Sequence, residues 1–318
     1  MKILANDGIS VSGVEKLKAG GFEVITNNVP QEELINYINS ESVTGILVRS
    51  ATKVRQDIID SCPSLKLIGR GGVGMDNIDV DYARSKGLSV INTPAASSLS
   101  VAELVMGHFF NVARGLHDSN KNMHSKGHSD FKVLKKKYAK GVELRGKTLG
   151  IIGSGRIGKA LASYALGLGM KVIANDRSNN EVKINLEIAG HGSIEVAVPS
   201  VSLEELLAAS DFISVHVPAQ TDGKPVIGSA ELNMMKEGVI LANASRGGII
   251  DEKALMEACN SGKVRAAALD VFVNEPTPAQ EVLSCDHFSL SPHIGAATME
   301  AQDRIGLELA DQIISILN

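Results

Sequence analysis

A histidine, a glutamate and an arginine in the last third of the chain are suited to acid–base chemistry on a small acid. His293 lies in "LSPHIGAAT", Glu275 in "LDVFVNEP" and Arg246 in "NASRGG". Imidazole, with a reference pKa of about 6.5, can take up a proton and return it. A nearby carboxylate stabilises imidazolium, and a planar guanidinium binds a carboxylate in bidentate fashion. Each residue alone could equally be a satisfied polar group at a strand end.

A glycine-rich turn predicts a dinucleotide site. "GIIGSGRIGKALA" places Gly153, Gly155 and Gly158 in a GxGxxG pattern between an apolar run and a helix-like run. Such glycines permit a tight turn, a close approach by pyrophosphate and close helix–strand packing, while the helix N-terminus offers N–H groups. Asp176, after the next strand, can bind ribose hydroxyls and repel a 2′-phosphate, which predicts NAD; Arg177 could instead accommodate that phosphate. A helix cap without a ligand is the alternative.

The chain alternates short apolar runs with amphipathic stretches, from "KILAND" and "VSGVEKLKAG" to "LKLIGRG". This rhythm stops near "INTPAASSLSVAELV", where a long helix is expected, and restarts at "KTLGIIG". Strand–helix alternation is typical of parallel sheets covered on both faces. We therefore expect an α/β protein with two doubly wound parallel-sheet domains, and a final helix, "MEAQDRIGLELADQIISILN", that packs on one of them.

Polar side chains follow several of the expected strands, where open α/β sheets collect their ligands. Their number and mixed chemistry predict a pocket with arginines for anions and a histidine–glutamate pair. These residues are Arg49, Arg70, His216, Arg246, Asp270, Glu275 and His293.

Composition and charge exclude several classes of protein. The 318 residues carry a formal net charge of −4, without a basic field for nucleic acid. The start of the chain lacks signal-peptide features, and no apolar run is long enough to cross a membrane, so a cytoplasmic protein is expected. Cys62, Cys259 and Cys285 are widely spaced and predict neither disulfides nor a zinc site. No metal site is expected at His124 and His128, which we place at a fraying helix end.

Four segments in this order, "GIIGSGRIGKALA", "NASRGGIIDEKAL", "AALDVFVNEP" and "SPHIGAAT", resemble the NAD-dependent D-2-hydroxyacid dehydrogenase family over essentially the whole chain. "ILVRSATKV", "LIGRGGVGMDNID" and "INTPAASSLSVAELV" narrow the resemblance to the branch that oxidises 3-phospho-D-glycerate, the first step of phosphorylated serine biosynthesis. Two departures are the unfamiliar segment 177–199 and the lack of a regulatory domain after the last helix, so serine feedback through such a domain is not expected.

The resemblance implies a Rossmann-type NAD-binding domain, residues 99–292, inserted into a flavodoxin-like substrate domain, residues 1–98 plus 293–318. The chain would cross between the domains near 97–100 and near 291–294, which places His293 at a hinge facing the cleft. A homodimer formed through the long helix after Ser98 is also implied.

The resemblance further implies residue roles. His293 would be the general base, Glu275 would orient it, and Arg246 would bind the substrate carboxylate; Asp270 would contact the nicotinamide carboxamide. The predicted cofactor-binding residues are Gly153, Gly155, Arg156, Ile157, Gly158, Asp176, His216, Pro218, Ala244, Asp270, His293 and Gly295. The predicted substrate-binding residues are Arg49, Ser50, Arg70, Gly72, Val73, Gly74, Arg246 and His293, with the Thr52 hydroxyl beside them.

Alternatives remain for the substrate and for the class of protein. We favour a phosphorylated 2-hydroxy acid, because Arg49 and Arg70 would otherwise have no anion, unless they pair with Asp76 or Asp79. The other enzymatic reading is a reductase of glyoxylate, hydroxypyruvate or D-lactate type. An NAD-sensing, corepressor-like binding protein is the alternative outside enzymes. The lysine run 132–140 is expected to be a solvated face, or to reach a partner's substrate in a dimer.

Overall fold

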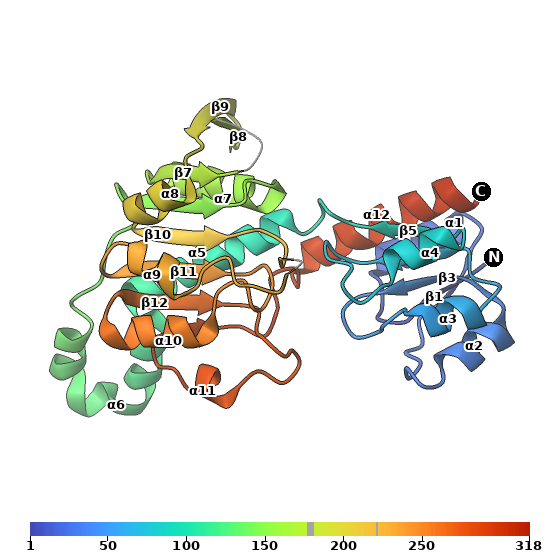
Figure 1. Cartoon of the computed structure of the whole chain (residues 1–318), viewed down its shortest axis with the longest axis horizontal. Coiled ribbons are helices and arrows are strands. Elements are labelled where there is room, and N and C mark those ends of the chain that lie inside the picture. The colour runs from blue at the N-terminus through green and yellow to red at the C-terminus, as the bar shows by residue number, and fades with distance from the viewer. Residues whose placement is uncertain (177–180, 221) are drawn as a thin grey trace. The chain divides into compact units, whose positions relative to one another are not determined.

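The computed structural model describes residues 1–176, 181–220 and 222–318, and the chain divides into two compact units (Figure 1). Unit 1 comprises Met1–Ser100 and Ala296–Asn318, and unit 2 comprises Val101–Gly295. The expected boundaries lie two or three residues earlier in the chain. His293 thus lies in unit 2. In the same unit, the Asp270 carboxylate accepts hydrogen bonds from the N–H groups of Ile294 and Gly295, which follow His293.

Unit 1 is built on a five-stranded parallel sheet of order β2-β1-β3-β4-β5, the flavodoxin-like order. Its strands are β1 (Lys2–Ala5), β2 (Glu23–Ile25), β3 (Val43–Val48), β4 (Leu67–Arg70) and β5 (Ser89–Asn92). Its helices are α1 (Val11–Ala19), α2 (Leu34–Glu41), α3 (Gln56–Ser61), α4 (Val80–Ser85) and α12 (Met299–Leu317).

The last helix of the chain belongs to unit 1. Thr298 caps α12 by accepting a hydrogen bond from the Ala301 N–H, and the buried side chains of Ile305, Leu309 and Ile313 face the sheet core at helical spacing. Helix α12 also lies against α1, where a Cβ on Gly13 would stand 2.9 Å from Gly306 Cα. Small residues at this crossing let the two helix backbones touch.

Unit 2 has a six-stranded parallel sheet of order β13-β12-β11-β10-β6-β7. The strands are β6 (Thr148–Ile152), β7 (Lys171–Asn175), β10 (Phe212–Val215), β11 (Val239–Asn243), β12 (Val264–Leu269) and β13 (Phe288–Leu290). The helices are α5 (Ser98–Arg114, whose first turn precedes the boundary), α6 (Leu116–Lys137), α7 (Arg156–Gly167), α8 (Leu203–Ala209), α9 (Ser229–Met234), α10 (Glu252–Ser261) and α11 (Gln280–Leu283).

Two hydrophobic layers cover the unit 2 sheet. One contains α5 and α7, with Phe109 packed edge-on against Phe212 at 5.2 Å between ring centroids. The other contains α8, α9 and α10, represented by Leu206, Leu232 and Leu255. Burial on both faces explains the continuous apolar runs of the central strands. The predicted fold class, with two doubly wound parallel-sheet domains, is confirmed.

The segment 177–199 contains an antiparallel hairpin of β8 (Glu181–Ile188) and β9 (Gly192–Pro199). Val182, Ile184 and Val198 at its base are buried in the core beside α7, while Ile188 and Ile194 near its tip are exposed. Residues 177–180, including Arg177, lie outside the described residues. The hairpin occupies the connection between β7 and α8, where the sequence departs from the family that it resembles.

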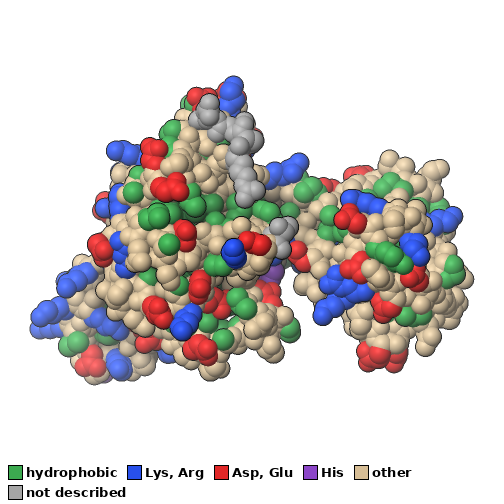
Figure 2. Space-filling model, viewed as in Figure 1, with side chains coloured by type: hydrophobic (Ala, Val, Ile, Leu, Met, Phe, Trp, Pro, Cys, Tyr) green, Lys and Arg blue, Asp and Glu red, His purple; other side chains and the backbone are tan. Residues whose placement is uncertain are grey.

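Helix α6 corrects the interpretation of the histidine pair. His124 and His128 lie within α6, which continues to Lys137 with one non-helical residue at Asp130, so neither is at a frayed end. Figure 2 shows Lys and Arg side chains gathered over the α6 part of unit 2. In the described part of the chain, no helix is long and apolar enough to span a membrane.

Candidate active site

His293 and Glu275 are paired. Nδ1 of His293 lies 2.7 Å from Oε2 of Glu275, and Oε1 of Glu275 accepts a hydrogen bond from the Phe272 N–H at 2.9 Å. The two residues come from the loops after β13 and β12, which are neighbouring strands. Their side chains are 43% and 34% exposed, so the pair is accessible to a small ligand. With Nδ1 committed to the carboxylate, Nε2 is the ring nitrogen available to a substrate.

The backbone at His293 adopts a left-handed conformation, with φ of 53°. Left-handed conformations are uncommon for residues with a side chain and need support from their surroundings. Asp270, which is 2% exposed, supplies that support. Its Oδ1 accepts from the Ile294 N–H at 2.8 Å and from the Ser291 hydroxyl at 2.6 Å, and its Oδ2 accepts from the Gly295 N–H at 2.8 Å. Asp270 thus fixes the turn that carries His293.

Arg246 lies on the turn after β11, and this turn is adjacent to the loop of Glu275. The Asn243 amide donates to the Arg246 carbonyl at 2.8 Å, which ties the turn to the end of β11. A Cβ on Gly247 would stand 1.9 Å from the carbonyl oxygen of Phe272, so only glycine permits this approach. Because the Phe272 N–H binds Glu275, the turns of Arg246 and Glu275 are packed together.

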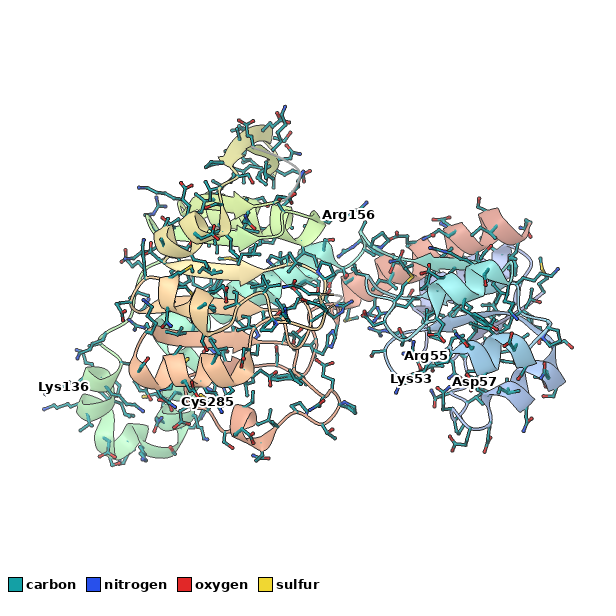
Figure 3. All side chains as sticks on the ribbon, in the orientation of Figure 1. Lys53, Arg55, Asp57, Lys136, Arg156 and Cys285 are labelled. Carbon is teal, nitrogen blue, oxygen red and sulfur yellow. The ribbon has the colours of Figure 1, made fainter. Side chains whose placement is uncertain are left out.

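The glycine turn has the shape that a pyrophosphate needs. Gly153 has φ of 94°, and a Cβ on Gly158 would stand 2.2 Å from the Gly153 carbonyl oxygen. Gly155, in contrast, faces space with no atom within 4 Å of a built Cβ. The N–H groups of Arg156 and Ile157, in the first turn of α7, have no acceptor among the described residues. Figure 3 shows Arg156 beside this end of α7. The residues present therefore fit an anionic dinucleotide.

Asp176 stands beside the same turn. Its Oδ2 accepts hydrogen bonds from the N–H of Ser154 at 3.2 Å and from the Ser154 hydroxyl at 2.5 Å. The Ser200 hydroxyl accepts from the Asp176 N–H at 3.3 Å. Ser154, the first variable residue of the GxGxxG pattern, was not among the predicted site residues, and its type at that position is the only sequence signal for it.

The other predicted cofactor residues of unit 2 lie on the loops after β10 and β11. Gly153 packs against His216, whose carbonyl oxygen would be 2.6 Å from a Cβ at that glycine. Nε2 of His216 lies 2.9 Å from the Ser214 hydroxyl, and burial lowers the pKa of His216 to about 4. Pro218 is exposed and Ala244 is half-buried. His216 is thus a neutral lining residue beside the glycine turn.

In unit 1, the predicted substrate residues lie on two adjacent loops at the carboxyl end of the sheet. Val48 of β3 pairs with Arg70 of β4, and Arg49 Cγ would be 3.6 Å from a Cβ on Gly71. The Arg70 guanidinium folds over its own loop, donating to the Gly71 carbonyl at 2.9 Å, and Gly72 leaves the space that it occupies.

Exposed donors accompany these arginines. Ser50 is exposed and Arg49 is half-buried. The Gly72 N–H is bonded to the Arg70 carbonyl, whereas the N–H groups of Val73 and Gly74 have no acceptor within the described ranges. Val73 is 41% exposed. These two N–H groups could receive an anion.

Thr52 corrects one expectation. Its hydroxyl donates to Asp7 Oδ1 at 2.6 Å and accepts from the Asn6 amide at 2.8 Å, and the residue is 4% exposed. Asp7 also accepts from the N–H groups of Arg49 at 2.6 Å and Thr52 at 3.1 Å. The hydroxyl is therefore used to hold the loop of Arg49 in place and is not offered to a ligand.

Asp79 does not pair with Arg49 or Arg70, because its carboxylate is bound to Arg55, with Nη1 and Oδ1 2.8 Å apart. Within the described residues, no three His, Cys, Asp or Glu side chains are grouped so that they could hold a metal ion.

His108 is a polar residue that the analysis of the sequence did not select. It lies on α5 with its ring between the hydroxyls of Ser289 and Ser291, at 2.8 and 2.9 Å, and burial lowers its pKa. The signal available in the sequence was a histidine within the apolar run "VAELVMGHFF".

Comparisons with known proteins identify relatives of this chain. Residues 106–295 match the model of the D-isomer specific 2-hydroxyacid dehydrogenase NAD binding domain. A D-3-phosphoglycerate dehydrogenase of Methanocaldococcus jannaschii is 41% identical over 317 residues, covering 100% of this chain and 57% of that protein. The chain thus spans little more than half the length of this relative. A hydroxypyruvate reductase of Thermotoga maritima is 44% identical, covering 93% of this chain and 91% of that protein.

A solved structure has the same fold. The TT0316 protein from Thermus thermophilus matches 100% of this chain and 97% of its own, with a TM-score of 0.85 and 28% identity. Together with the glycine turn and the His293–Glu275 pair, the matched model and the relatives show that this chain belongs to the D-isomer specific 2-hydroxyacid dehydrogenase family, with unit 2 as its NAD-binding domain.

Proposed function

We propose that the protein catalyses the NAD-dependent oxidation of 3-phospho-D-glycerate to 3-phosphohydroxypyruvate. The observation that carries the dehydrogenase chemistry is the His293–Glu275 pair, held at 2.7 Å, with the loop of Glu275 packed against the turn of Arg246. In this proposal unit 1, with its boundary near 98–100 and 293–296, is the substrate domain.

His293 acts as the base. Oxidation of a 2-hydroxy acid removes a proton from the C2 hydroxyl, and Nε2 of His293 takes it while Glu275 stabilises the resulting imidazolium. When bound, NAD supplies the acceptor for the hydride that leaves C2. Arg246 binds the C1 carboxylate through its guanidinium fork and orients the C2 oxygen toward His293. In the reverse direction the imidazolium returns the proton.

The cofactor is bound by the glycine turn. Gly155, Arg156, Ile157 and Gly158 receive the pyrophosphate, and Asp176, held by Ser154, receives the ribose hydroxyls. His216, Pro218, Ala244 and Gly295 line the remainder of the cofactor site.

The phosphate group is assigned to unit 1. Arg49 and Ser50 lie on the loop after β3, next to the loop that follows Arg70. The Val73 and Gly74 N–H groups of that second loop lack acceptors among the described residues. Asp7 and the Asn77 amide hold the Arg49 loop rigidly, the latter by donating to the Arg49 carbonyl at 2.8 Å. Prepositioned arginine and amide donors favour a multiply charged anion over a neutral hydroxymethyl group.

A second candidate is the reduction of unphosphorylated hydroxypyruvate, which is favoured by the 44% identity to the Thermotoga maritima hydroxypyruvate reductase. The two are separated by kcat/KM for phosphorylated and unphosphorylated hydroxypyruvate with NADH. We expect a preference of at least about a hundredfold for the phosphorylated substrate, equivalent to about 2.7 kcal/mol of transition-state binding. This preference for the phosphorylated substrate should be smaller in Arg49→Ala and in Arg70→Ala. Equal use of both substrates would reject the phosphorylated assignment.

We further propose a homodimer formed through α5 and α6. Both helices carry exposed apolar side chains, namely Phe110, Leu116, Met123, Phe131 and Val133. Several exposed apolar side chains on neighbouring helices are expected on a surface that another chain covers. Light scattering after gel filtration should give twice the chain mass, and Phe131→Glu should shift it to one chain mass.

A further inference from the structure

A chain of polar side chains crosses unit 2 from a surface groove to the turn of His293. The groove, of about 910 Å³, lies between α5, α6 and the segment from β12 to β13, and His108, Asn111 and Ser289 line it. The Asn111 amide donates to the Ser289 hydroxyl at 2.7 Å, and the His108 ring connects Ser289 to Ser291. Ser291 continues to Asp270.

The direction of every hydrogen bond in this chain can be assigned from its two ends. Asp270 as a carboxylate can only accept, so the Ser291 hydroxyl donates to it and must accept from Nε2–H of His108. Burial keeps the ring neutral, and its Nδ1 must therefore accept from the Ser289 hydroxyl.

The hydrogen bonds of Asn111, at the groove end of the chain, have the same direction. The carbonyl oxygen of the Asn111 side chain accepts from the His117 N–H at 2.7 Å, which leaves its NH₂ group to donate to Ser289. All donors thus point toward Asp270, and His108 must be the Nε2–H tautomer.

We propose that His108 is a positioning residue for the reaction, acting on His293 through Ser291 and Asp270. The carboxylate of Asp270 holds the N–H groups of Ile294 and Gly295, and these bonds fix the left-handed backbone at His293. The Ser291 hydroxyl, which accepts from His108 and donates to Asp270, orients that carboxylate. This inference rests on the proposed dehydrogenase function of His293.

The kinetic test compares His108→Leu with His108→Gln, which retains an N–H donor near the position of Nε2. We expect His108→Leu to lower kcat about tenfold, the effect of one lost buried hydrogen bond, with KM for the hydroxy acid nearly unchanged. His108→Gln should recover most of the rate. Gly107→Ala is the matched control, because a Cβ there meets no atom within 4 Å. Native kcat in His108→Leu would overturn the inference, as would equal losses in both histidine variants.

Two measurements do not depend on turnover. Nitrogen-15 NMR of native protein should show His108 as the neutral Nε2–H tautomer, and the opposite tautomer would overturn the assigned bond directions. Amide hydrogen exchange at Ile294 and Gly295 should accelerate in His108→Leu and not in Gly107→Ala. Unchanged exchange would remove the link between His108 and the turn. A native protein without activity on any 2-hydroxy or 2-keto acid would instead contradict the proposed function, while these two readouts still decide the hydrogen-bond chain.

Discussion

His293 Nδ1 lies 2.7 Å from Glu275 Oε2, and this contact commits one ring nitrogen to a carboxylate while the other stays available. The arrangement requires both loops to be held, one by Asp270 and the other by the Phe272 N–H. A histidine 25 positions before the chain's last residue is thereby placed beside Glu275 of the loop after the neighbouring strand.

Removal of His293 should abolish most of the chemistry. We expect His293→Ala to lower kcat by about 10² to 10⁴, the usual contribution of a general base, while NADH affinity in a calorimetric titration changes less than about twofold. The two measurements separate loss of the proton path from loss of the cofactor site. A near-native kcat in His293→Ala would show that His293 has a structural role and is not the base.

Glu275→Gln should lower kcat for 2-hydroxy acid oxidation by about tenfold or more. The carboxylate stabilises the imidazolium that forms when His293 takes the proton, and a neutral amide stabilises it less. The glutamine still accepts from Phe272, which preserves the loop. A native kcat would show that Glu275 does not act on the ring.

Asp176 and Ser154 should control the preference for NAD over NADP. Asp176→Ala removes the negative charge that would repel a 2′-phosphate, so the ratio of the two dissociation constants should fall by about tenfold or more. Ser154→Ala should lower this ratio by a smaller factor, because the Asp176 carboxylate keeps its charge and loses only the Ser154 hydroxyl that orients it. Calorimetric titration with NAD and with NADP gives the two dissociation constants of each variant. If the native protein bound NADP more tightly than NAD, residues other than Asp176 would set the cofactor preference.

Gly247→Ala should destabilise unit 2 and impair turnover together. The new methyl group would meet the Phe272 carbonyl at 1.9 Å, so the Arg246 turn and the Glu275 loop must separate, at a cost of about 1 to 3 kcal/mol. Gly167→Ala, whose methyl group meets no atom within 4 Å, is the control. Urea unfolding should show a lower midpoint only for the first variant.

The free energy of unfolding should fall as the pH is lowered from about 6.5 to about 4, with a contribution from His216. Its folded pKa is about 4, below the unfolded value of 6.5. Between these values the unfolded chain binds a proton that the folded protein does not bind, and this binding stabilises the unfolded state. The contribution is about 3 kcal/mol at its limit, which is reached below the folded pKa. Denaturant unfolding at pH 7 and pH 5 should show a smaller difference in His216→Gln than in the native protein. An equal difference would mean that other groups dominate.

Local patterns in the sequence were sufficient to predict the two parallel sheets and to select candidate site residues at their edges, but not to predict the β8–β9 hairpin. The apolar runs of "KTLGIIG" and "GVILANAS" predict buried parallel strands, because a strand covered on both faces has no polar alternation. Gly153, Gly158 and Asp176 follow from a turn whose requirements are met within one strand–helix–strand unit. His293, Glu275 and Arg246 were identified because polar residues after such strands gather at one edge of a sheet.

Tertiary structure decided which partner each polar side chain has. Thr52 has the type of a phosphate ligand but its hydroxyl binds Asp7, 45 residues away, and His108 pairs with Ser289, 181 residues away. Such partners depend on how separate elements pack, because a hydrogen bond requires a separation near 3 Å that no sequence spacing specifies. The pairing of β12 with β13 therefore determined that Asp270 is a buried anchor for the turn of His293.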